Sequence, residues 1–327
     1  MEPLTFEPII VPKPWGGRRL ERFGKELAPD GLFGESWEVA DLPTDAVTSS
    51  EQTRSRVSGG ADDGATLSDL ISLHGSDLLG SARATERGDF PLLVKFLDAR
   101  EHLSVQVHPT GDYVARHPGT WLKTESWCVV DADPGAVLYK GFRPGVTMEQ
   151  VAQAAGTRDF VELLQAVDAV AGDFHHLPAG IVHALGAGVL VAEIQTPSDT
   201  TFRLYDWTDE YGRAPRPLHI GEGLDTVALD PDGAVTIAPL RGQGSRTLIE
   251  TEQYWLVEHK LDEGRIPLEQ RSELRILMVT RGAVSVSSDG HRTGHPVGST
   301  IMLPACLVAQ TDVVVSEPGA VIEIGLV

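Results

Sequence analysis

The strongest constraint on the fold is a series of short runs rich in β-branched and aromatic residues, each ended by Gly, Pro or Asp. These runs predict strands at 92–97, 103–107, 127–130, 189–194, 201–207, 275–279, 283–286, 313–315 and 321–324. Short strands separated by turn residues are typical of sandwiches and barrels. We therefore expect a mainly β protein.

Two stretches follow a helical period instead. Apolar residues recur at three- and four-residue spacing near 67–80 and over 148–171, for example at Phe160, Leu164 and Val167. This spacing predicts helices beside the β structure. The polar, Gly-rich stretch from Arg54 to Thr66 predicts a loop.

Charge and composition limit the partners. The 327 residues include 27 Lys and Arg against 47 Asp and Glu, a net charge of −20. Such a surface repels phosphate backbones, so we expect no nucleic-acid partner, and an anionic substrate needs a local cluster of cations in a cleft. No apolar run predicts a membrane span or a secretory signal. Cys128 and Cys306 lie far apart without CxxC spacing, which favours a reducing compartment and a cytoplasmic protein.

One internal similarity suggests a repeated unit. Residues 172–184 read GDFHHLPAGIVHA and residues 298–310 read GSTIMLPACLVAQ, so that Gly and Pro-Ala align at an offset of 126. The match is short enough that chance competes with a true repeat. If the repeat is real, two related barrels meet near residue 238, and Ala309 replaces His183 in the second.

Three separate motifs carry candidate metal ligands. Ser104, Gln106 and His108 share one face of a predicted strand, because side chains alternate along it. By itself this pattern is weak, and a histidine at a strand end that bonds a backbone carbonyl is the more usual interpretation. Lys123 and Glu125 share a face in the same way, and a solvated ion pair is the competing interpretation.

The third motif is more specific. The spacing from Gly172 through Pro178 and Gly180 to His183 matches the second metal motif of cupin barrels, although Ala187 stands where cupins often have Asn. Two imidazoles, one carboxylate and one amide oxygen would suit Zn²⁺, and also Mn²⁺, Fe²⁺, Co²⁺ or Ni²⁺. Such a site keeps an open position for water or substrate.

Charged residues inside apolar runs add further candidates. Glu193 ends the run 189–194, Arg203 lies between Phe202 and Leu204, and Lys95 lies within 92–97. A charge in such surroundings is usually paired or functional, and a structural Arg–Glu or Arg–Asp bridge is the alternative for Arg203.

Together these segments resemble the type I mannose-6-phosphate isomerases, in their short bacterial form. The resemblance runs from about residue 10 to 225 in consistent order, and is looser beyond 238. It rests on KPWGG, GESWE, PLLVKFLDAREHLSVQVHP, LKTESW, YKGFRPGVT, LPAGIVHALGAGVLVAEIQTPSDTTFRLYDW and RPLHIGEGLD.

The resemblance implies two cupin or jelly-roll-like barrels, a catalytic domain over 1–237 with a helical insertion and a degenerate barrel over 238–327. It implies one zinc ion per chain and a small hexose phosphate as substrate, and leaves the oligomeric state open. The implied zinc ligands are Gln106, His108, Glu125 and His183. The implied active-site residues are Arg203, Lys123 and Glu193, with Lys95 and Ser104 near the substrate.

An aldose–ketose isomerase needs a base and groups that stabilise negative charge on O1 and O2 of a cis-enediol. Glu193, Lys123 and a water on the metal are all candidates for the base, and we favour Glu193. Arg203, supported by Lys123, would stabilise the enediolate. The alternatives are an isomerase for another hexose phosphate, a metal oxygenase, or a sugar-binding cupin without catalysis.

Overall fold

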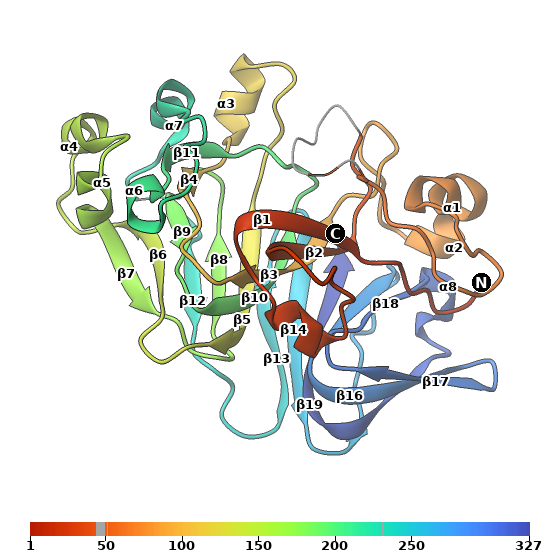
Figure 1. The fold of residues 1–327 in the computed structure, drawn as a ribbon. Helices are drawn as coiled ribbons and strands as arrows, with labels where there is room; N and C mark the ends of the chain where they lie inside the picture. The colour runs from red at the N-terminus through yellow and green to blue at the C-terminus, as the bar shows by residue number, and fades with distance from the viewer. Residues whose placement is uncertain (44–49, 51, 231) are drawn as a thin grey trace.

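Antiparallel strands dominate the computed structural model, which describes residues 1–43, 50, 52–230 and 232–327 (Figure 1). Two sheets enclose the first barrel. In order across the first sheet lie β1 (Ile9–Gly17), β2 (Phe33–Val39), β3 (Leu93–Ala99), β10 (Val189–Gln195), β5 (Glu125–Ala132), β8 (Phe174–Leu177) and β12 (Val235–Ile237). Across the second lie β11 (Phe202–Tyr205), β4 (Val105–Val107), β9 (His183–Leu185), β6 (Val137–Phe142) and β7 (Leu164–Asp168).

A third sheet is built from the C-terminal part of the chain. Its strands are β13 (Gly244–Glu250), β14 (Tyr254–Leu261), β19 (Asp312–Leu326), β16 (Arg275–Ser288) and β17 (His291–Pro296), with β15 (Gly264–Arg265) on β19 and β18 (Thr300–Leu303) on β16. The expectation of a mainly β, cupin-like fold is confirmed. The division into domains at residue 238 stays a proposal, which the separate third sheet supports.

Helices are short and lie at the periphery (Figure 1). They comprise the 3₁₀ helix η1 (Arg19–Phe23) and the α-helices α1 (Leu67–His74), α2 (Ser76–Leu79), α3 (Gly111–Arg116), α4 (Met148–Ala154), α5 (Asp159–Glu162), α6 (Thr208–Tyr211), α7 (Ile220–Thr226) and α8 (Ala305–Val308). Within the described ranges, no helix is long and apolar enough to cross a membrane.

The helix predicted over 148–171 is only partly correct. Helices α4 and α5 account for its first half, but Leu164 and Val167 lie in β7. Strand β7 pairs with β6 at the end of the second sheet, where Val167 lies opposite Leu138. A free edge of β6 gave these residues ladder hydrogen bonds, and this tertiary pairing outweighed their helical spacing.

Four of the predicted strands merge into two. The runs 275–279 and 283–286 belong to the single strand β16, and 313–315 and 321–324 belong to β19. The pairing of β16 with β19 shifts register between Val279 and Val284, where β-bulges absorb the polar Thr280-Arg281-Gly282 interruption. The loop predicted over Arg54–Thr66 contains only isolated bridges, as expected.

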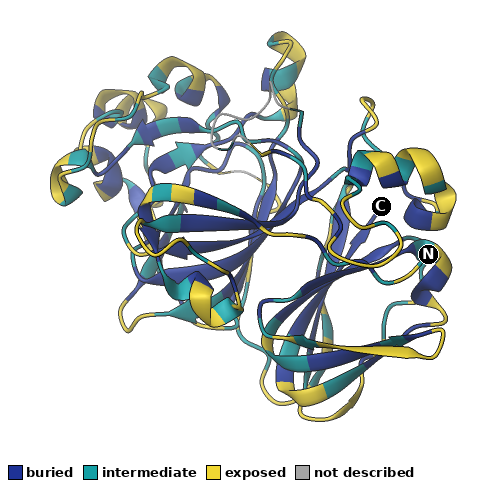
Figure 2. Cartoon of the chain, turned by 45° about the vertical axis from the view of Figure 1, so that its right-hand side comes forward, coloured by how far each residue is buried: buried dark blue, intermediate teal, exposed yellow. Residues whose placement is uncertain are grey.

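One apolar cluster lies between the first sheet and the third sheet. Strands β3 and β10 are buried along their whole length, because one face lines the first barrel and the other packs against the third sheet (Figure 2). This explains why both read as nearly unbroken apolar runs rather than as alternating ones. A charged side chain on either strand is therefore buried and needs a partner or a function.

Candidate metal centre and active site

Three buried side chains from distant segments meet at the mouth of the first barrel. His108 follows β4, Glu125 begins β5 and His183 begins β9, and none is more than 1% exposed. Their donor atoms all lie within 4.8 Å of one another. Nε2 of His108 lies 3.1 Å from Glu125 Oε1, and Nε2 of His183 lies 3.2 Å from Glu125 Oε2.

A tight turn before His183 brings the two histidines together. Gly180 has φ of +88°, a left-handed conformation that favours glycine. Its N–H donates to the carbonyl of His108 at 3.1 Å, and a Cβ there would come within 2.8 Å of Thr110. The turn formed by the Pro-Ala-Gly sequence is therefore anchored to the backbone of His108.

Backbone carbonyls orient both imidazoles. Nδ1 of His108 donates to the carbonyl of Thr200 at 3.0 Å, and Nδ1 of His183 donates to that of Ile181 at 2.9 Å. With Nδ1 as the donor, each ring directs Nε2 toward Glu125. Metal-bound histidines are held by the same kind of hydrogen bond.

The resulting arrangement favours a cation between the three residues. Burial, with Lys123 nearby, lowers the pKa of His108 to about 3, so the ring is neutral near pH 7. Burial opposes ionisation of Glu125, yet Lys123 and the histidines hold the pKa of Glu125 well below its usual range. Nε2 of His108 and Oε2 of Glu125 make no hydrogen bond although both are buried. Acceptors facing one another in this way fit a divalent metal ion.

Gln106, the fourth predicted ligand, is adjacent but turned the other way. It pairs with His183 across β4 and β9, and its Nε2 lies 3.4 Å from Nε2 of His183. Its Oε1 faces Ser104 Oγ at 3.5 Å. An amide that rotates about its last torsion exchanges the two atoms, so ligation through oxygen requires that rotation.

A cavity opens beside the three donors, between the first and second sheets. Its wall includes Glu125 and Gln106 and the other predicted site residues, namely Lys95, Ser104, Lys123, Glu193 and Arg203. Lys123 is 4% exposed, and its Nζ lies 2.9 Å from Glu125 Oε1. All the predicted candidates therefore converge on one region, either in the cavity wall or in the three-donor cluster.

Alternating charges cross the floor of this cavity on neighbouring strands. Lys13 on β1 contacts Glu35 on β2 at 2.8 Å, Glu35 contacts Lys95 on β3 at 3.5 Å, and Lys95 contacts Glu193 on β10 at 2.8 Å. Lys13 and Glu35 were not predicted as site residues, although each is a charge in a segment that carries the family resemblance. The only feature of the sequence that could have indicated them is that each is a charged residue within one of these segments.

Glu193 lies at the end of this row. Trp127 Nε1 donates to its Oε1 at 2.7 Å, and the carboxylate is 2% exposed. Burial and the nearby charge of Glu125 raise the pKa of Glu193, while Lys95 and Lys123 oppose the rise. A carboxylate with a raised pKa is a stronger base than an ordinary one.

Arg203 reaches the opposite wall from β11. Its Nη1 donates to the carbonyl of Pro217 at 2.7 Å, while its Nε is buried without a hydrogen bond. Arg216, another residue that was not predicted, lines the same wall and is paired with Asp206. Among the described residues, no Glu or Asp forms an ion pair with Arg203, so the structural bridge that competed with a functional role for Arg203 is not formed.

Fold and donor set together define a metal-binding cupin-type protein. Residues 12–121 match the family described as phosphomannose isomerase type I, catalytic domain. A mannose-6-phosphate isomerase of Streptococcus mutans is 32% identical over 93% of this chain and 92% of its own. One from Bacillus subtilis is 32% identical over 93% of both chains. The chain belongs to the type I mannose-6-phosphate isomerase family.

Solved structures agree with this assignment. The mannose 6-phosphate isomerase of Bacillus subtilis superposes with a TM-score of 0.81 at 25% identity, covering 99% of each chain. A mannose 6-phosphate isomerase bound with zinc and yttrium shares the fold, with a TM-score of 0.73 at 17% identity over the whole of both chains.

Proposed function

We propose that this chain is a metal-dependent aldose–ketose isomerase that interconverts mannose 6-phosphate and fructose 6-phosphate. The observation that carries the proposal is the convergence of His108, Glu125 and His183 on a cavity that also holds Glu193 and Arg203. The activity of the family's named members supports the choice of substrate. A non-catalytic cupin would not need this set of buried charges.

We propose Zn²⁺ as the ion, held by His108, Glu125 and His183, with Gln106 as a fourth ligand after rotation of its amide. Nitrogen and oxygen donors without thiolate suit zinc, and also Mn²⁺, Fe²⁺, Co²⁺ or Ni²⁺. When bound, the ion would supply Lewis-acid stabilisation of negative charge on substrate oxygens.

Isomerisation moves one proton from C2 to C1 and one from O2 to O1, with no net change in composition. We assign the carbon proton to Glu193, whose burial and raised pKa suit a base that must return its proton. Trp127 and Lys95 hold this carboxylate in place. The row of alternating charges thereby serves to orient the base.

Negative charge on O1 and O2 of the enediolate would be stabilised by Arg203, with Lys123 in support. Arg203 has an unused buried Nε, and its other contact is to a neutral carbonyl. Its charge is thus available to the substrate rather than cancelled by a carboxylate. Lys123 is shared with Glu125 and would act more weakly.

Lys95 and Ser104 remain the proposed contacts of the substrate phosphate end. Ser104 is 4% exposed and lies in the cavity wall. Lys95 already has two carboxylates close to its ammonium group, so a phosphate would compete with Glu35 and Glu193 for it. Lys95 would therefore serve both as a contact of the phosphate end and as a positioning group for Glu193.

We also propose a cytoplasmic location. Neither Cys128, which is buried, nor Cys306, which is exposed, forms a disulfide. Unpaired cysteines are typical of proteins from reducing compartments.

A coupled assay of fructose 6-phosphate formation from mannose 6-phosphate tests the proposed activity. We expect turnover that a chelator abolishes and added Zn²⁺ restores, with metal content measured on the same sample. Turnover that persists after complete removal of metal would reject the metal-dependent mechanism. Metal-loaded protein without turnover would favour the sugar-binding alternative.

A further inference from the structure

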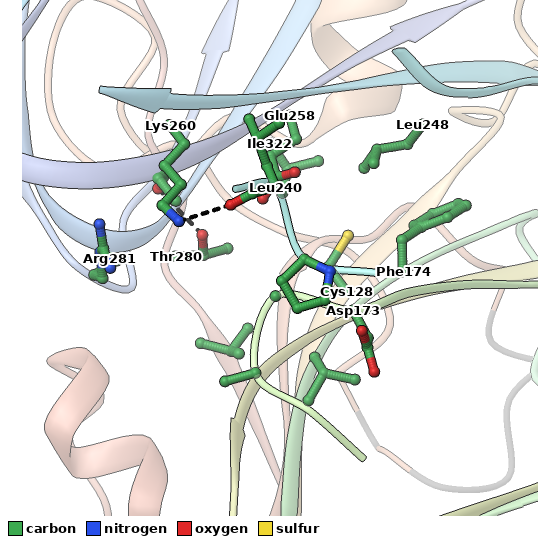
Figure 3. Close-up of a pocket in the computed structure, with 16 residues that line it drawn as sticks. Cys128, Asp173, Phe174, Leu240, Leu248, Glu258, Lys260, Thr280, Arg281 and Ile322 are labelled. Carbon is green, nitrogen blue, oxygen red and sulfur yellow. Dashed lines mark hydrogen bonds between the residues drawn. The ribbon is translucent and has the colours of Figure 1, made fainter. Parts of the chain in front are cut away.

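A second cavity lies at the junction of the two barrels, away from the catalytic cavity (Figure 3). One wall comes from β5 and the turn into β8, and the other from β14, β16 and β19. The connecting residues Pro239 and Leu240 complete it. None of its lining residues lines the catalytic cavity.

The two ends of this cavity differ in character. Lys260, Thr280 and Arg281 gather at one end, whereas Phe174 and Leu248 lie toward the other (Figure 3). Apolar atoms of Val130, Pro239 and Ile322 also line it; the space is therefore amphipathic, cationic at one end and mainly apolar elsewhere.

The two cations lack acidic partners in the part of the chain that the structure describes. Lys260 donates to the carbonyl of Leu240 at 2.9 Å and forms no ion pair. The side chain of Arg281 has no hydrogen bond or ion pair with any described residue. In the catalytic cavity, by contrast, Lys95 and Arg216 are each paired with a carboxylate.

The carboxylates in the wall do not cancel these cations. Glu258 is bound to Arg246 Nε at 2.8 Å, so its charge is already compensated. Asp173 lies toward Cys128 rather than beside Lys260 (Figure 3), and burial raises its pKa. A ligand anion at the Lys260 end would therefore meet two uncompensated positive charges.

We propose that this cavity binds a small anion with an apolar body, such as an aromatic or aliphatic phosphate monoester. The anionic group contacts Lys260 and Arg281, and the body packs against Leu248 and Phe174. The Thr280 hydroxyl donates to the carbonyl of Ala320 at 3.1 Å and stays bound there. Because the lining comes from both barrels, a bound ligand bridges them and stabilises their junction.

Phenyl phosphate is a suitable probe, because it combines both features, and calorimetry measures its binding to the full chain. We expect binding that saturating mannose 6-phosphate does not displace. Lys260→Gln and Arg281→Gln should each weaken binding by about tenfold or more, whereas Arg292→Gln, on exposed β17, should not change it. Inorganic phosphate and phenol, each with one of the two features, should bind more weakly than phenyl phosphate.

A third variant tests the cavity without touching its charges. Ala320 lines the space on β19, and Ala320→Leu should fill it and remove binding while leaving both cations in place. Thermal melts of each variant confirm that it is folded. Displacement of phenyl phosphate by mannose 6-phosphate, equal affinity for inorganic phosphate, or unchanged affinity in both Gln variants would overturn the proposal.

Discussion

The two stretches that resemble each other in sequence, 172–184 and 298–310, begin alike in the structure and then diverge. Gly172 and Gly298 both have positive φ, at 93° and 85°. Strands β8 and β18 follow at the same offset of 126 residues, and each is ended by a proline. After Pro178 the chain turns through Gly180 into β9 and His183, whereas after Pro304 it enters helix α8.

A histidine and a glutamate also meet within the third sheet, but with a different outcome. Nε2 of His259 lies 2.8 Å from Glu323 Oε2, and Nδ1 of His259 lies 2.7 Å from Ser245 Oγ. Arg275 Nε donates to Glu323 Oε1 at 2.9 Å, and the Glu269 N–H also donates to this carboxylate. Each of these donors and acceptors is satisfied.

The comparison shows that His and Glu together do not define a metal site. At Glu125 the Lys123 ammonium contacts only Oε1, while Oε2 and the facing Nε2 of His108 are buried without a hydrogen bond, so a metal ion would complete the site. At Glu323 a fixed guanidinium already provides the positive charge. We infer that a His–Glu cluster is structural where a protein cation satisfies the carboxylate, and is a candidate metal centre where buried acceptor atoms remain without partners.

The sharpest test removes one histidine from each network. His183→Ala should lose its metal ion and lower turnover by roughly a thousandfold, because a metal supplies several kcal/mol of transition-state stabilisation. His259→Ala is the matched control and should keep one ion per chain. Metal analysis by mass spectrometry, with turnover of both variants, decides the matter; full metal occupancy in His183→Ala would mean that the ligand set is misassigned.

Arg275→Met tests the cation of the second network. It leaves Glu323 buried without its guanidinium, which should cost about 3–5 kcal/mol in the free energy of unfolding. Metal content and turnover of the folded fraction should stay unchanged. Urea denaturation measures the loss, and a variant as stable as the parent would show that the Arg275–Glu323 pair contributes little.

Arg203→Ala tests the cation that faces the cavity of the first barrel. We expect kcat to fall by about two orders of magnitude or more, since the variant loses charge stabilisation at the reacting oxygens. Circular dichroism and metal content should match those of the parent. A fall of only a few-fold would reject the proposed role of Arg203.

Lys95→Met gives the smallest expected effect and tests the base. Removing a positive charge beside Glu193 raises the pKa of this carboxyl further. In the pH profile of kcat/KM, the acidic limb should therefore move to higher pH by about one unit. Lys13→Met is the control, because Lys13 contacts Glu35 and not Glu193. An acidic limb that stays in place in both variants would argue against Glu193 as the base.

The candidate site was predictable because its residues interrupt strong local patterns. His108, Glu125 and His183 each occur in a short motif, and the residue spacing within each motif was enough to nominate a metal ligand. Glu193 and Lys95 stood out as charges in apolar runs. Arg216 and the pairing of Lys13 with Glu35 were missed, since Arg216 lies outside the strands and Lys13 meets Glu35 only when β1 pairs with β2.

By itself the sequence determined the mainly β class, the position of most strands and the nature of the donor set, because turn residues and alternation act locally. Only the tertiary structure decided that residues 164–168 pair with β6 as a strand, that the Gln106 amide turns its nitrogen toward His183, and that Glu125 lacks the guanidinium that neutralises Glu323. The physical reason is that a strand partner, an amide orientation and a compensating charge are all supplied by groups from elsewhere in the chain, which meet only in the folded protein.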